Sequence, residues 1–509
     1  MSDYNFLMES RLSPEQYKVQ NLVSRIAAAR GLNLYLVGGA VRDLTYGQQV
    51  VRDLDFAVEG NPQKILRLLP EPIARKKGRR KTIPLPGGTN DPAVEYCSFD
   101  RRANSADLRF ANGVRAELGM CRQEIYPKPG SRPEVRSAMI FDDLKRRDFS
   151  INAMGVSLHP NSRGLLLDPT NGADDIERHE LRALHSRSFL EDPSRIYRLL
   201  RFSVRLGFSP DERTQRWLDA ALEERAWDRL DADQQSRELR AILYEDNPGR
   251  LFKVLAERQI LSGLDKSLAS ARIPFDRFTR IRSVAQSVPG ADPFLLNVFC
   301  MVEKLSPAHK VRLAKKVVAE NRAIKLVLSL DREAKKLERT LASSKADMPS
   351  RVYTLLSGQP LPLLLFILVS SKSARVQNRV KSHFFKFPQI RARLPRMELQ
   401  SLGLKPGPEF DRILDRIFFL QVDGKIRTHQ QLMKELRALA GIKEPPKAPA
   451  PKVPPATSQL RRKKGEAAVH QGETSIPAPS VRPVKKVKNL HKVPAKKPAR
   501  LRAQERRGH

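Results

Sequence analysis

Two aspartates separated by one residue are the first group in this sequence that could carry out chemistry. Asp53 and Asp55 lie in residues 53–58, where polar and apolar residues alternate as in a β-strand. Because residues i and i+2 of a strand point to the same face, the two carboxylates would lie side by side and could bind Mg²⁺. Such a pair resists joint ionisation unless a cation is present, and two-metal phosphoryl transfer requires this arrangement. The alternative is a strand end with two hydrated surface acids.

A glycine pair precedes these aspartates and could approach a phosphate. Gly38 and Gly39 separate a short apolar run, residues 34–37, from a helical stretch at residues 40–46. At such a turn backbone N–H groups can reach a phosphate, and the start of the helix adds positive potential. Arg42 could then pair with a phosphate oxygen. The alternative is an ordinary turn between a strand and a helix.

Strands and helices alternate around these residues and must position them. A helix is expected at residues 14–30, and the order of strand, glycine turn, helix and strand starts a mixed α/β domain. Two further short strands are expected at residues 93–99 and 114–118. From about residue 174 the helical period takes over and continues to about residue 440.

One of the later helices would carry a row of arginines. Asp192 and Pro193 predict its start, with Asp as the N-cap and Pro at the first helical position. An apolar face follows, and four arginines fall within an arc of about 120° beside it. These arginines are Arg195, Arg198, Arg201 and Arg205.

The charge of the chain favours a polyanionic partner. Its 93 Lys and Arg residues exceed its 56 Asp and Glu residues, which gives a formal net charge of +37. Such a charge suits nucleic acid or an acidic membrane surface. The longest apolar run, residues 363–369, is far shorter than the roughly 20 residues that span a bilayer, so no membrane insertion is expected. Three cysteines in no metal-ligand spacing suit a cytoplasmic protein and argue against a zinc site.

Residues 443–509 differ in kind from the rest of the chain. They hold 18 Lys and Arg residues against 4 Asp and Glu residues, so they contribute +14 to the total of +37. The segment is rich in proline and contains no aromatic residue. It is expected to be disordered, because it cannot bury enough apolar area to offset the entropy of the chain.

Four groups of residues, in order along the chain, resemble the motifs of class II tRNA nucleotidyltransferases (CCA-adding enzymes) and bacterial poly(A) polymerases, within the polymerase-beta superfamily. The first group is LVGGAVRD followed by RDLDFAVEG, and the second is RRDFSINAM at residues 146–154. The third is LDP followed by GADDI, within residues 167–176, and the fourth is EDPSR at residues 191–195. The resemblance covers roughly residues 33–210.

The resemblance implies a role for each group. Asp53 and Asp55 would hold two Mg²⁺ ions, and Glu117 is the best candidate by position for a third catalytic acid, although relatives usually have Asp there. The residues expected to bind the nucleotide are Gly38, Gly39, Arg42, Arg146, Asp148, Asn152, Asp192, Arg195 and Arg198. Among these, Asp192 and Arg195 would select the base.

An Asp and Arg pair has a physical logic for selecting a base without a template. Asp offers acceptors to an exocyclic amine, and Arg offers donors to a ring nitrogen or a carbonyl oxygen. C and A both carry an amine beside a ring acceptor, whereas U and G present the opposite polarity there. Asp192 and Arg195 lie about one helical turn apart, so both can reach one base. Asp192 could instead be only a helix cap.

The expected fold is α+β: a small mixed-sheet, palm-like nucleotidyltransferase head, an all-helical neck and body, and a disordered basic C-terminal tail. The boundaries are expected at residues 1–160, 161–235, 236–442 and 443–509. The expected reaction is template-independent addition of CMP and/or AMP to a tRNA 3′ end from CTP and ATP, and the tail could contact RNA nonspecifically. The sequence departs from the family pattern between residues 70 and 125, so CC addition, A addition and full CCA addition all stay open. The alternatives are a poly(A) polymerase that acts on RNA 3′ ends, and a non-catalytic RNA-binding protein with a degenerate polymerase head.

Overall fold

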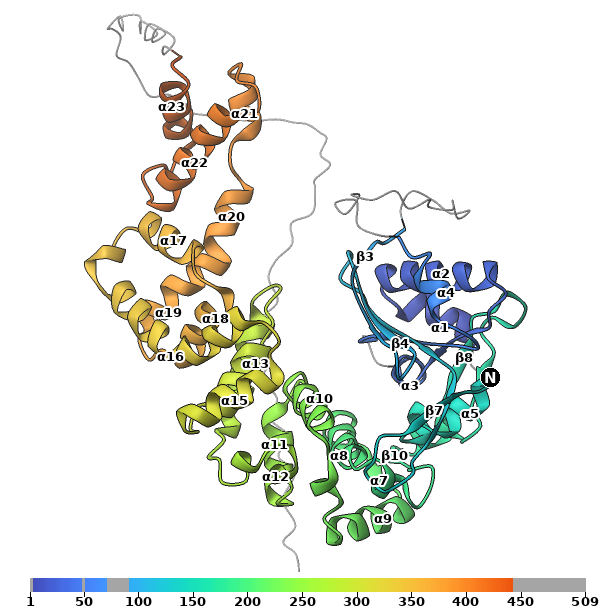
Figure 1. Ribbon diagram of the computed structural model, residues 1–509. Coiled ribbons are helices and arrows are strands. Elements are labelled where there is room, and N and C mark those ends of the chain that lie inside the picture. The colour runs from blue at the N-terminus through green and yellow to red at the C-terminus, as the bar shows by residue number, and fades with distance from the viewer. Residues whose placement is uncertain (1–2, 48–50, 71–90, 443–509) are drawn as a thin grey trace, which may run out of the picture. The chain divides into compact units, whose positions relative to one another are not determined.

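The computed structural model describes residues 3–47, 51–70 and 91–442 (Figure 1). A mixed sheet in the N-terminal part of the chain has the strand order β3-β4-β5-β2-β1-β8-β9. Neighbouring strands run antiparallel except β2 and β5, which are parallel. The strands of this sheet are β1 (Leu34–Val37), β2 (Leu54–Val58), β3 (Val94–Asp100), β4 (Ser105–Phe110), β5 (Arg115–Met120), β8 (Gly155–Ser157) and β9 (Leu166–Leu167).

Alternating side chains give the sheet a core face and a polar face. In β4, Ala106, Leu108 and Phe110 are buried, and in β5, Ala116 and Leu118 are buried. The residues between them are polar and point away from the core, because successive side chains of a strand lie on opposite faces. The acidic residues of these strands therefore share the face that the core does not use.

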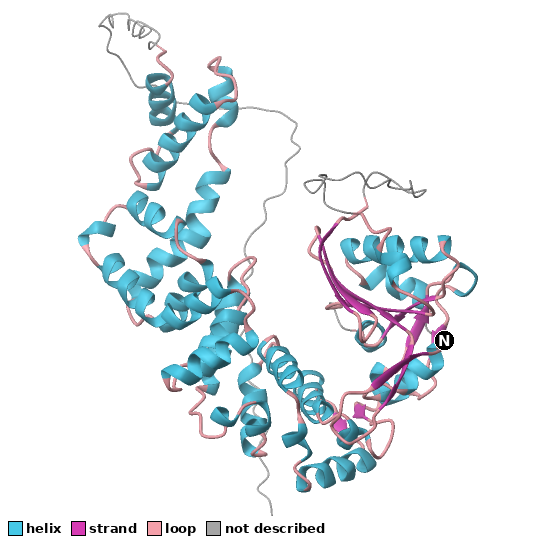
Figure 2. Ribbon diagram, in the orientation of Figure 1, coloured by secondary structure: helices cyan, strands magenta, loops and turns pink. Residues whose placement is uncertain are grey.

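Helices cover the core face of the sheet. Figures 1 and 2 show α1, α2 and α4 together on one side of it. Helix α2 begins at a capping box in which Ser13 and Gln16 exchange hydrogen bonds, and it buries an apolar stripe that includes Val19, Val23 and Ile26. The helices of this region are α1 (Tyr4–Arg11), α2 (Pro14–Ala29), α3 (Gly39–Tyr46), α4 (Gln63–Leu66) and α5 (Ile140–Lys145). A separate hairpin is formed by β6 (Arg122–Ile125) and β7 (Glu134–Ser137).

The chain after β9 is mostly helical. Helix α16 shows why, because its buried residues Ile324, Val327, Leu330, Ala334, Leu337 and Leu341 follow a helical spacing. A short parallel pair also occurs, β10 (Glu180–Leu181) with β11 (Ser209–Pro210), which the sequence did not predict. The helices are α6 (Gly172–Glu177), α7 (Ser188–Glu191), α8 (Ser194–Leu206), α9 (Glu212–Glu223), α10 (Ala232–Leu243), α11 (Pro248–Glu257), α12 (Leu261–Leu264), α13 (Phe275–Ser287), α14 (Phe294–Val302), α15 (Pro307–Val317), α16 (Asn321–Ala342), α17 (Pro349–Ser357), α18 (Leu361–Ser370), α19 (Ala374–Lys381), α20 (Phe387–Ala392), α21 (Arg396–Ser401), α22 (Pro408–Val422) and α23 (His429–Leu439).

The expected fold class, a mixed-sheet head with a mostly helical remainder, is confirmed. The longest apolar run belongs to α18, whose side chains lie in the core. Within the described ranges, we find no helix with the length and apolar character needed to span a bilayer. The described residues belong to one compact unit that ends at Glu444, so the proposed boundaries at residues 160 and 235 stay predictions. The expected disorder of residues 443–509 concerns a segment outside the described residues.

Candidate active site

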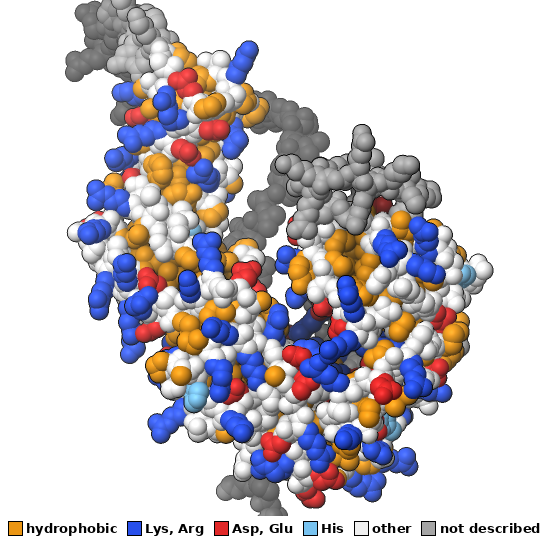
Figure 3. Space-filling view, viewed as in Figure 1, with side chains coloured by type: hydrophobic (Ala, Val, Ile, Leu, Met, Phe, Trp, Pro, Cys, Tyr) orange, Lys and Arg blue, Asp and Glu red, His pale blue; other side chains and the backbone are white. Residues whose placement is uncertain are grey.

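A cavity of about 1130 Å³ contains all the residues singled out in the sequence as site candidates. Its wall comes from the polar face of the sheet, from the turn between β1 and α3, from the end of α5, and from α8 and α10. Most of the lining side chains are charged, and Figure 3 shows Lys and Arg with some Asp and Glu around a hollow in the face it draws. The cavity is therefore suited to a polar, charged ligand.

Two carboxylates meet where β2 pairs with β5. The parallel register places Asp55 beside Glu117, and both line the cavity. Burial and the nearby carboxylates of Glu117 and Asp53 raise the pKa of Asp55 to about 7, although Arg147 acts to lower it. Loss of hydration and the carboxylate of a β4 neighbour, Asp107, likewise raise the pKa of Glu117. Burial is the larger cause of both raised pKa values, and the clustering of the acids adds to it.

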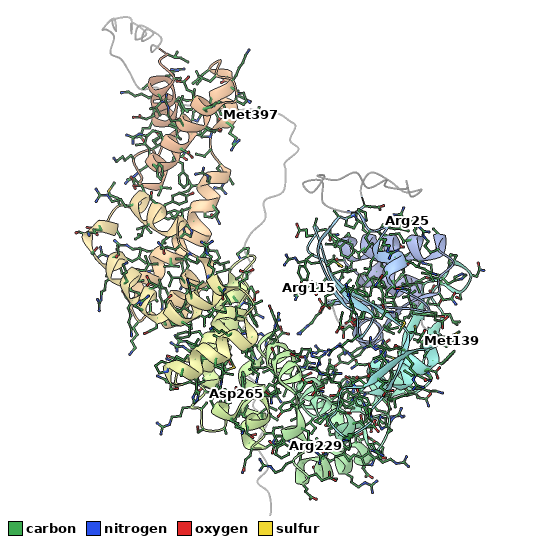
Figure 4. All side chains as sticks on the ribbon, in the orientation of Figure 1. Arg25, Arg115, Met139, Arg229, Asp265 and Met397 are labelled. Atoms are coloured by element: carbon green, nitrogen blue, oxygen red, sulfur yellow. The ribbon has the colours of Figure 1, made fainter. Side chains whose placement is uncertain are left out.

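The first aspartate of the pair differs from the prediction in its setting. Asp53 comes before β2, which begins at Leu54, and its carboxylate is about half exposed. It forms an ion pair with Arg115 on β5, labelled in Figure 4, at 3.5 Å. Both aspartates line the cavity, as expected. Among residues 3–47, 51–70 and 91–442, no three His, Cys, Asp or Glu side chains are grouped so that they could hold a metal ion.

The glycine turn lies close to the side chains of Arg147 and Asp55. Gly38 has a φ of +67°, which favours glycine. A Cβ there would lie 2.9 Å from Nη1 of Arg147 and 3.5 Å from Oδ2 of Asp55. Gly39 starts α3, and a Cβ there would lie 3.5 Å from Nη2 of Arg42. Gly38 is therefore required by its backbone conformation and by the close approach of an arginine.

Arg42 is engaged by protein groups. It is buried, and its Nε and Nη2 donate to Oδ1 of Asp43 at 2.9 and 2.7 Å. Its Nη1 donates to Oδ1 of Asn152 at 2.6 Å, and Asn152 in turn donates to Oδ1 of Asp148 at 3.0 Å. A phosphate would have to share or replace these bonds, so the predicted phosphate contact of Arg42 stays a prediction.

A buried aspartate that the sequence analysis passed over organises the two arginines of the second motif. Asp143 of α5 accepts from Nε and Nη2 of Arg146 at 3.0 and 2.7 Å, and from Nε and Nη2 of Arg147 at 3.2 and 2.9 Å. The free Nη1 of Arg146 donates to Glu124 of β6 at 2.9 Å. Burial alone would raise the pKa of Asp143, but Arg147 and Arg146 lower it to about 2. Asp143 thus holds both guanidinium groups at the cavity wall.

The predicted base-selecting residues also meet at the cavity. Oδ2 of Asp192 lies 3.8 Å from Nε of Arg195 and 3.7 Å from Nη2 of Arg198. The Nη1 and Nη2 atoms of Arg195 donate to Oγ of Ser188 at 2.8 Å and to the carbonyl oxygen of Arg146 at 2.9 Å. Its Nε is buried and has no hydrogen-bond partner among the described residues. The guanidinium of Arg195 is therefore held by hydrogen bonds at both terminal nitrogens, and its third donor, Nε, is buried facing Asp192.

The helix start predicted at Asp192 and Pro193 was placed one residue too early. Helix α8 begins at Ser194 with Pro193 in the N-cap position, and Asp192 is the C-cap of α7. The difference is small, because Pro193 already has a helical backbone, with φ −62° and ψ −15°, and Asp192 is extended, with φ −126° and ψ 90°, as is usual both before proline and at an N-cap. Its carboxylate still accepts from the backbone N–H of Ser194 at 3.1 Å, so part of the capping role is retained.

Several residues of the cavity wall were missed by the sequence analysis. The pairs of Asp143 with Arg146 and Arg147 have the i,i+3 and i,i+4 spacing of helical ion pairs, and this spacing could have revealed them. By contrast, Glu238 of α10 accepts from Nε of Arg198 at 3.3 Å across 40 residues of sequence, and no local signal announces that contact. The missed residues of the wall include Asp143, Arg147, Phe202 and Gln234, while Glu238 contacts Arg198 without lining the cavity.

Comparisons with known proteins find similarity to tRNA nucleotidyltransferases and to a poly A polymerase domain. Residues 34–182 match the family model described as the poly A polymerase head domain. The chain is 26% identical over 458 residues to an A-adding tRNA nucleotidyltransferase of Halalkalibacterium halodurans, covering 86% of this chain and 96% of that protein. It is 25% identical to the A-adding enzyme of Geobacter sulfurreducens (79% of this chain, 44% of that protein) and 35% identical to the CC-adding enzyme of Deinococcus radiodurans (48% and 59%). The matches thus span less than two thirds of the latter two relatives.

A solved structure supports the fold. A tRNA-processing enzyme in an apo form superposes with a TM-score of 0.51 at 23% identity, covering 81% of this chain and 98% of that chain. At this identity the similarity concerns the fold alone.

Proposed function

This chain belongs to the class II tRNA nucleotidyltransferase and bacterial poly(A) polymerase family, and on that premise we propose that it adds CMP and/or AMP to the 3′ end of tRNA without a template. CTP and ATP would be the substrates, and pyrophosphate would be released. The observation that carries the proposal is one cavity of about 1130 Å³ that contains both the acidic pair Asp53 and Asp55 and the pair Asp192 and Arg195. A nucleoside triphosphate needs both kinds of group. The carboxylates would bind the metal ions that accompany its charged phosphates, and the Asp and Arg pair would distinguish one base from another.

The acidic corner of the cavity is chemically suited to divalent metal ions. Asp53, Asp55 and Glu117 offer carboxylate oxygens, the ligands that Mg²⁺ prefers. The pKa of Asp55 is raised first by burial and then by the carboxylate of Glu117, and a bound cation would favour the ionised form that both oppose. Since no three His, Cys, Asp or Glu side chains of the described residues are grouped to hold a metal ion by themselves, we propose that Asp53 and Asp55 would hold the metal ions together with oxygens of the nucleotide phosphates, and that Glu117 supports them as a neighbouring acid. When bound, Mg²⁺ would supply Lewis-acid stabilisation of the negative charge on the reacting phosphate oxygens.

The remaining residues would bind and orient the nucleotide. The N-terminus of α3, which begins at Gly39, would present backbone N–H groups to a phosphate, whereas the N–H of Gly38 donates to the carbonyl oxygen of Met154 at 3.1 Å. Arg147 lies beside this turn, in position to meet the same negative charge. In the proposed reaction, the RNA 3′-hydroxyl oxygen forms a bond to the α-phosphorus, and the bond from that phosphorus to the bridging oxygen of pyrophosphate breaks. The proton of the 3′-hydroxyl passes to water, and no covalent enzyme intermediate is needed.

Base selection would take place at the other end of the cavity. Oδ2 of Asp192 would accept from the exocyclic amine of C or A, and the guanidinium of Arg195, whose Nε is buried 3.8 Å from that oxygen, would have to rotate to donate to the adjacent ring acceptor. U and G present a carbonyl and a ring N–H in these places, so they would meet an acceptor with an acceptor and a donor with a donor. The pair would therefore admit C and A and reject U and G.

The comparisons do not decide which nucleotides are added, because the relatives differ in activity. The relative aligned over nearly its whole length is A-adding, and a more identical but shorter match is CC-adding. A poly(A) polymerase that extends many RNAs is the second candidate, because the matching family model is described by that activity. A cytoplasmic location stays a prediction from the sequence.

One experiment separates these activities. Transfer RNAs that end at the discriminator base, at C and at CC are each offered a single labelled nucleotide with Mg²⁺. Labelling by CTP on the first two substrates alone indicates CC addition, and labelling by ATP on the CC substrate alone indicates A addition. A ladder of many A residues on any RNA indicates a poly(A) polymerase. The proposal fails if every combination stays unlabelled while the RNA is bound, because that is the behaviour of a non-catalytic RNA-binding protein.

A further inference from the structure

The two carboxylate oxygens of Asp192 have different surroundings. Oδ1 accepts three hydrogen bonds, from the backbone N–H of Ser194 at 3.1 Å, from its Oγ at 2.6 Å and from Nε2 of Gln234 at 3.2 Å. Oδ2 has only the longer contacts with Arg195 and Arg198. The two oxygens are thus distinguished: Oδ1 is saturated by the protein, and Oδ2 is the oxygen left to accept from a ligand.

Gln234 is itself held in one orientation. It occupies the third helical position of α10 in a capping box with Asp231, 42 residues beyond Asp192. Its backbone N–H donates to Oδ1 of Asp231 at 2.7 Å, and its Oε1 accepts from the backbone N–H of Asp231 at 3.1 Å. Because the amide oxygen is fixed by the cap, the amide nitrogen must point away from it, and Nε2 points to Asp192. One side chain therefore links the start of α10 to the segment that would select the base.

The start of α10 is tied to the β6–β7 hairpin as well. Arg132, in the loop of that hairpin, donates to Oδ2 of Asp231 at 2.9 Å and to Oδ2 of Asp233 at 2.6 Å. In the same loop the N–H of Gly130 donates to the carbonyl oxygen of Glu191 at 3.2 Å. The residue before Asp192 and the helix that carries Gln234 are thus fastened to one loop, which keeps the Gln234 amide within reach of the carboxylate.

We propose that Gln234 is a positioning residue for nucleotide selection, whose amide binds Oδ1 of Asp192 and thereby turns Oδ2 toward the exocyclic amine of the incoming C or A. This inference rests on the proposed function. Gln234 acts through Asp192 and needs no contact with the nucleotide. Without the amide, the carboxylate keeps its bonds to Ser194 but can rotate, and Oδ2 is no longer fixed against the two arginines.

The chain offers a substitution that separates this role from helix capping. Gln234→Glu keeps the side-chain acceptor, since Glu serves the capping box as well as Gln does. It removes the donor and places a carboxylate against Oδ1 of Asp192. Gln431→Glu is the matched control, because Gln431 occupies the same position of the capping box of α23, at Thr428, and lies outside the cavity.

The experiment measures incorporation efficiencies of CTP, ATP, UTP and GTP on tRNAs that end at the discriminator base, at C and at CC, with thermal melting alongside. We expect Gln234→Glu to lose roughly tenfold of the preference for the natural nucleotide over UTP and GTP, the scale of one base-reading contact. Gln431→Glu should keep the wild-type ratios, and both variants should melt at similar temperatures. In an Asp192→Asn background, Gln234→Glu should cause little further loss, because both changes disturb one carboxylate.

Two results would overturn the inference, and they are distinguishable. If the wild type incorporates nucleotides and Gln234→Glu keeps the wild-type ratios, then Gln234 does not position Asp192, and the proposed function stands. If the wild type incorporates no nucleotide on any tRNA, the proposed function fails and the inference fails with it. Should Gln234→Glu melt far below the control, Gln234→Met is compared with Gln431→Met in its place, since both remove a capping acceptor without adding a charge and only Gln234→Met removes the donor to Asp192. Unchanged ratios in that variant would also overturn the inference.

Discussion

Replacement of Asp143 by Asn should destabilise the protein because it removes one charge that serves two arginines. Asp143 is 1% exposed, and its carboxylate lies 2.7 Å from Nη2 of Arg146 and 2.9 Å from Nη2 of Arg147. Asn keeps the size of the side chain and one acceptor oxygen but leaves both buried guanidinium groups without their shared counter-charge. Arg146 retains Glu124, whereas Arg147 has no other acidic partner within 4 Å among the residues the structure describes.

The magnitude follows from the pKa of the carboxyl group. Burial would raise it, but Arg147 and Arg146 lower it from 3.8 to about 2. Each pKa unit corresponds to about 1.4 kcal/mol, so the native interactions favour the ionised carboxylate by about 2 kcal/mol at pH 7. Loss of one partner from a buried ion pair typically costs about 3–5 kcal/mol, since the other charge is left uncompensated. We expect Asp143→Asn to lower the free energy of unfolding by about 3 kcal/mol.

The stability difference between wild type and Asp143→Asn should depend on pH in a definite direction. Because the folded pKa is lower than the unfolded one, the contribution of Asp143 is fully present above about pH 4 and is lost as the pH falls toward 2. The difference between wild type and Asp143→Asn should therefore be constant near neutral pH and shrink in acid. Urea unfolding followed by circular dichroism, at pH values from 7 down to 3, measures it.

A neighbouring residue supplies the control. Asp142→Asn removes the same charge from the same helix, and Asp142 makes no ion pair with any residue of the described ranges. It should change stability by less than about 0.5 kcal/mol, as surface substitutions usually do. Equal stabilities of the two variants at pH 7 would refute the reasoning, and so would a difference between wild type and Asp143→Asn that grows in acid.

Three further predictions concern the cavity and the tail. Gly38→Ala should reduce nucleotide incorporation at least tenfold, because its Cβ would meet Arg147; Gly113→Ala, at φ +85° with no atom within 4 Å, shares the backbone strain and should keep activity. Equal activities would remove the glycine turn from the site. Asp55→Ala should lower incorporation below about a thousandth while RNA binding measured by filter retention persists, and a near-normal rate with Mg²⁺ would disprove its role. Removal of residues 443–509, which carry +14, should give RNA affinity a shallower dependence on salt without changing the nucleotide added. An unchanged slope would show that the tail does not contact RNA phosphates.

The parts of the fold that local patterns determine could be predicted from the sequence. The predicted strands and helices around the glycine turn match β1, α3 and β2 within one residue, because apolar periodicity and glycine punctuation act over a few neighbours. Strand β4 was missed, since its residues Ser105–Phe110 alternate only briefly between turns. Strand β6 lies where the sequence departs from its relatives, so the resemblance gave no guide there.

The sequence predicted residues that line the cavity, but it predicted only some of the contacts that these residues make. Every candidate residue lines one cavity, yet Arg42 is bound by Asp43 and Asn152 instead of being free for a phosphate. The sequence places Asn152 110 residues beyond Arg42, so no spacing rule could announce the contact. The same holds for Gln234 and Asp192, 42 residues apart. Such contacts depend on tertiary packing, which a single sequence does not display.

The parallel pairing of β2 and β5 has a consequence for how the protein acquires its activity during synthesis. Asp55 and Glu117 come from strands that are distant in sequence, and their pairing closes a long loop whose entropy must be overcome before the contact forms. Until β5 leaves the ribosome, β2 has only β1 as a neighbour and exposes an unpaired edge of backbone groups, the kind of edge that invites aggregation. Chaperone binding to ribosome-bound chains should therefore peak after β2 emerges and fall once β5 has emerged, and truncated products that end before Arg115 should be the insoluble ones.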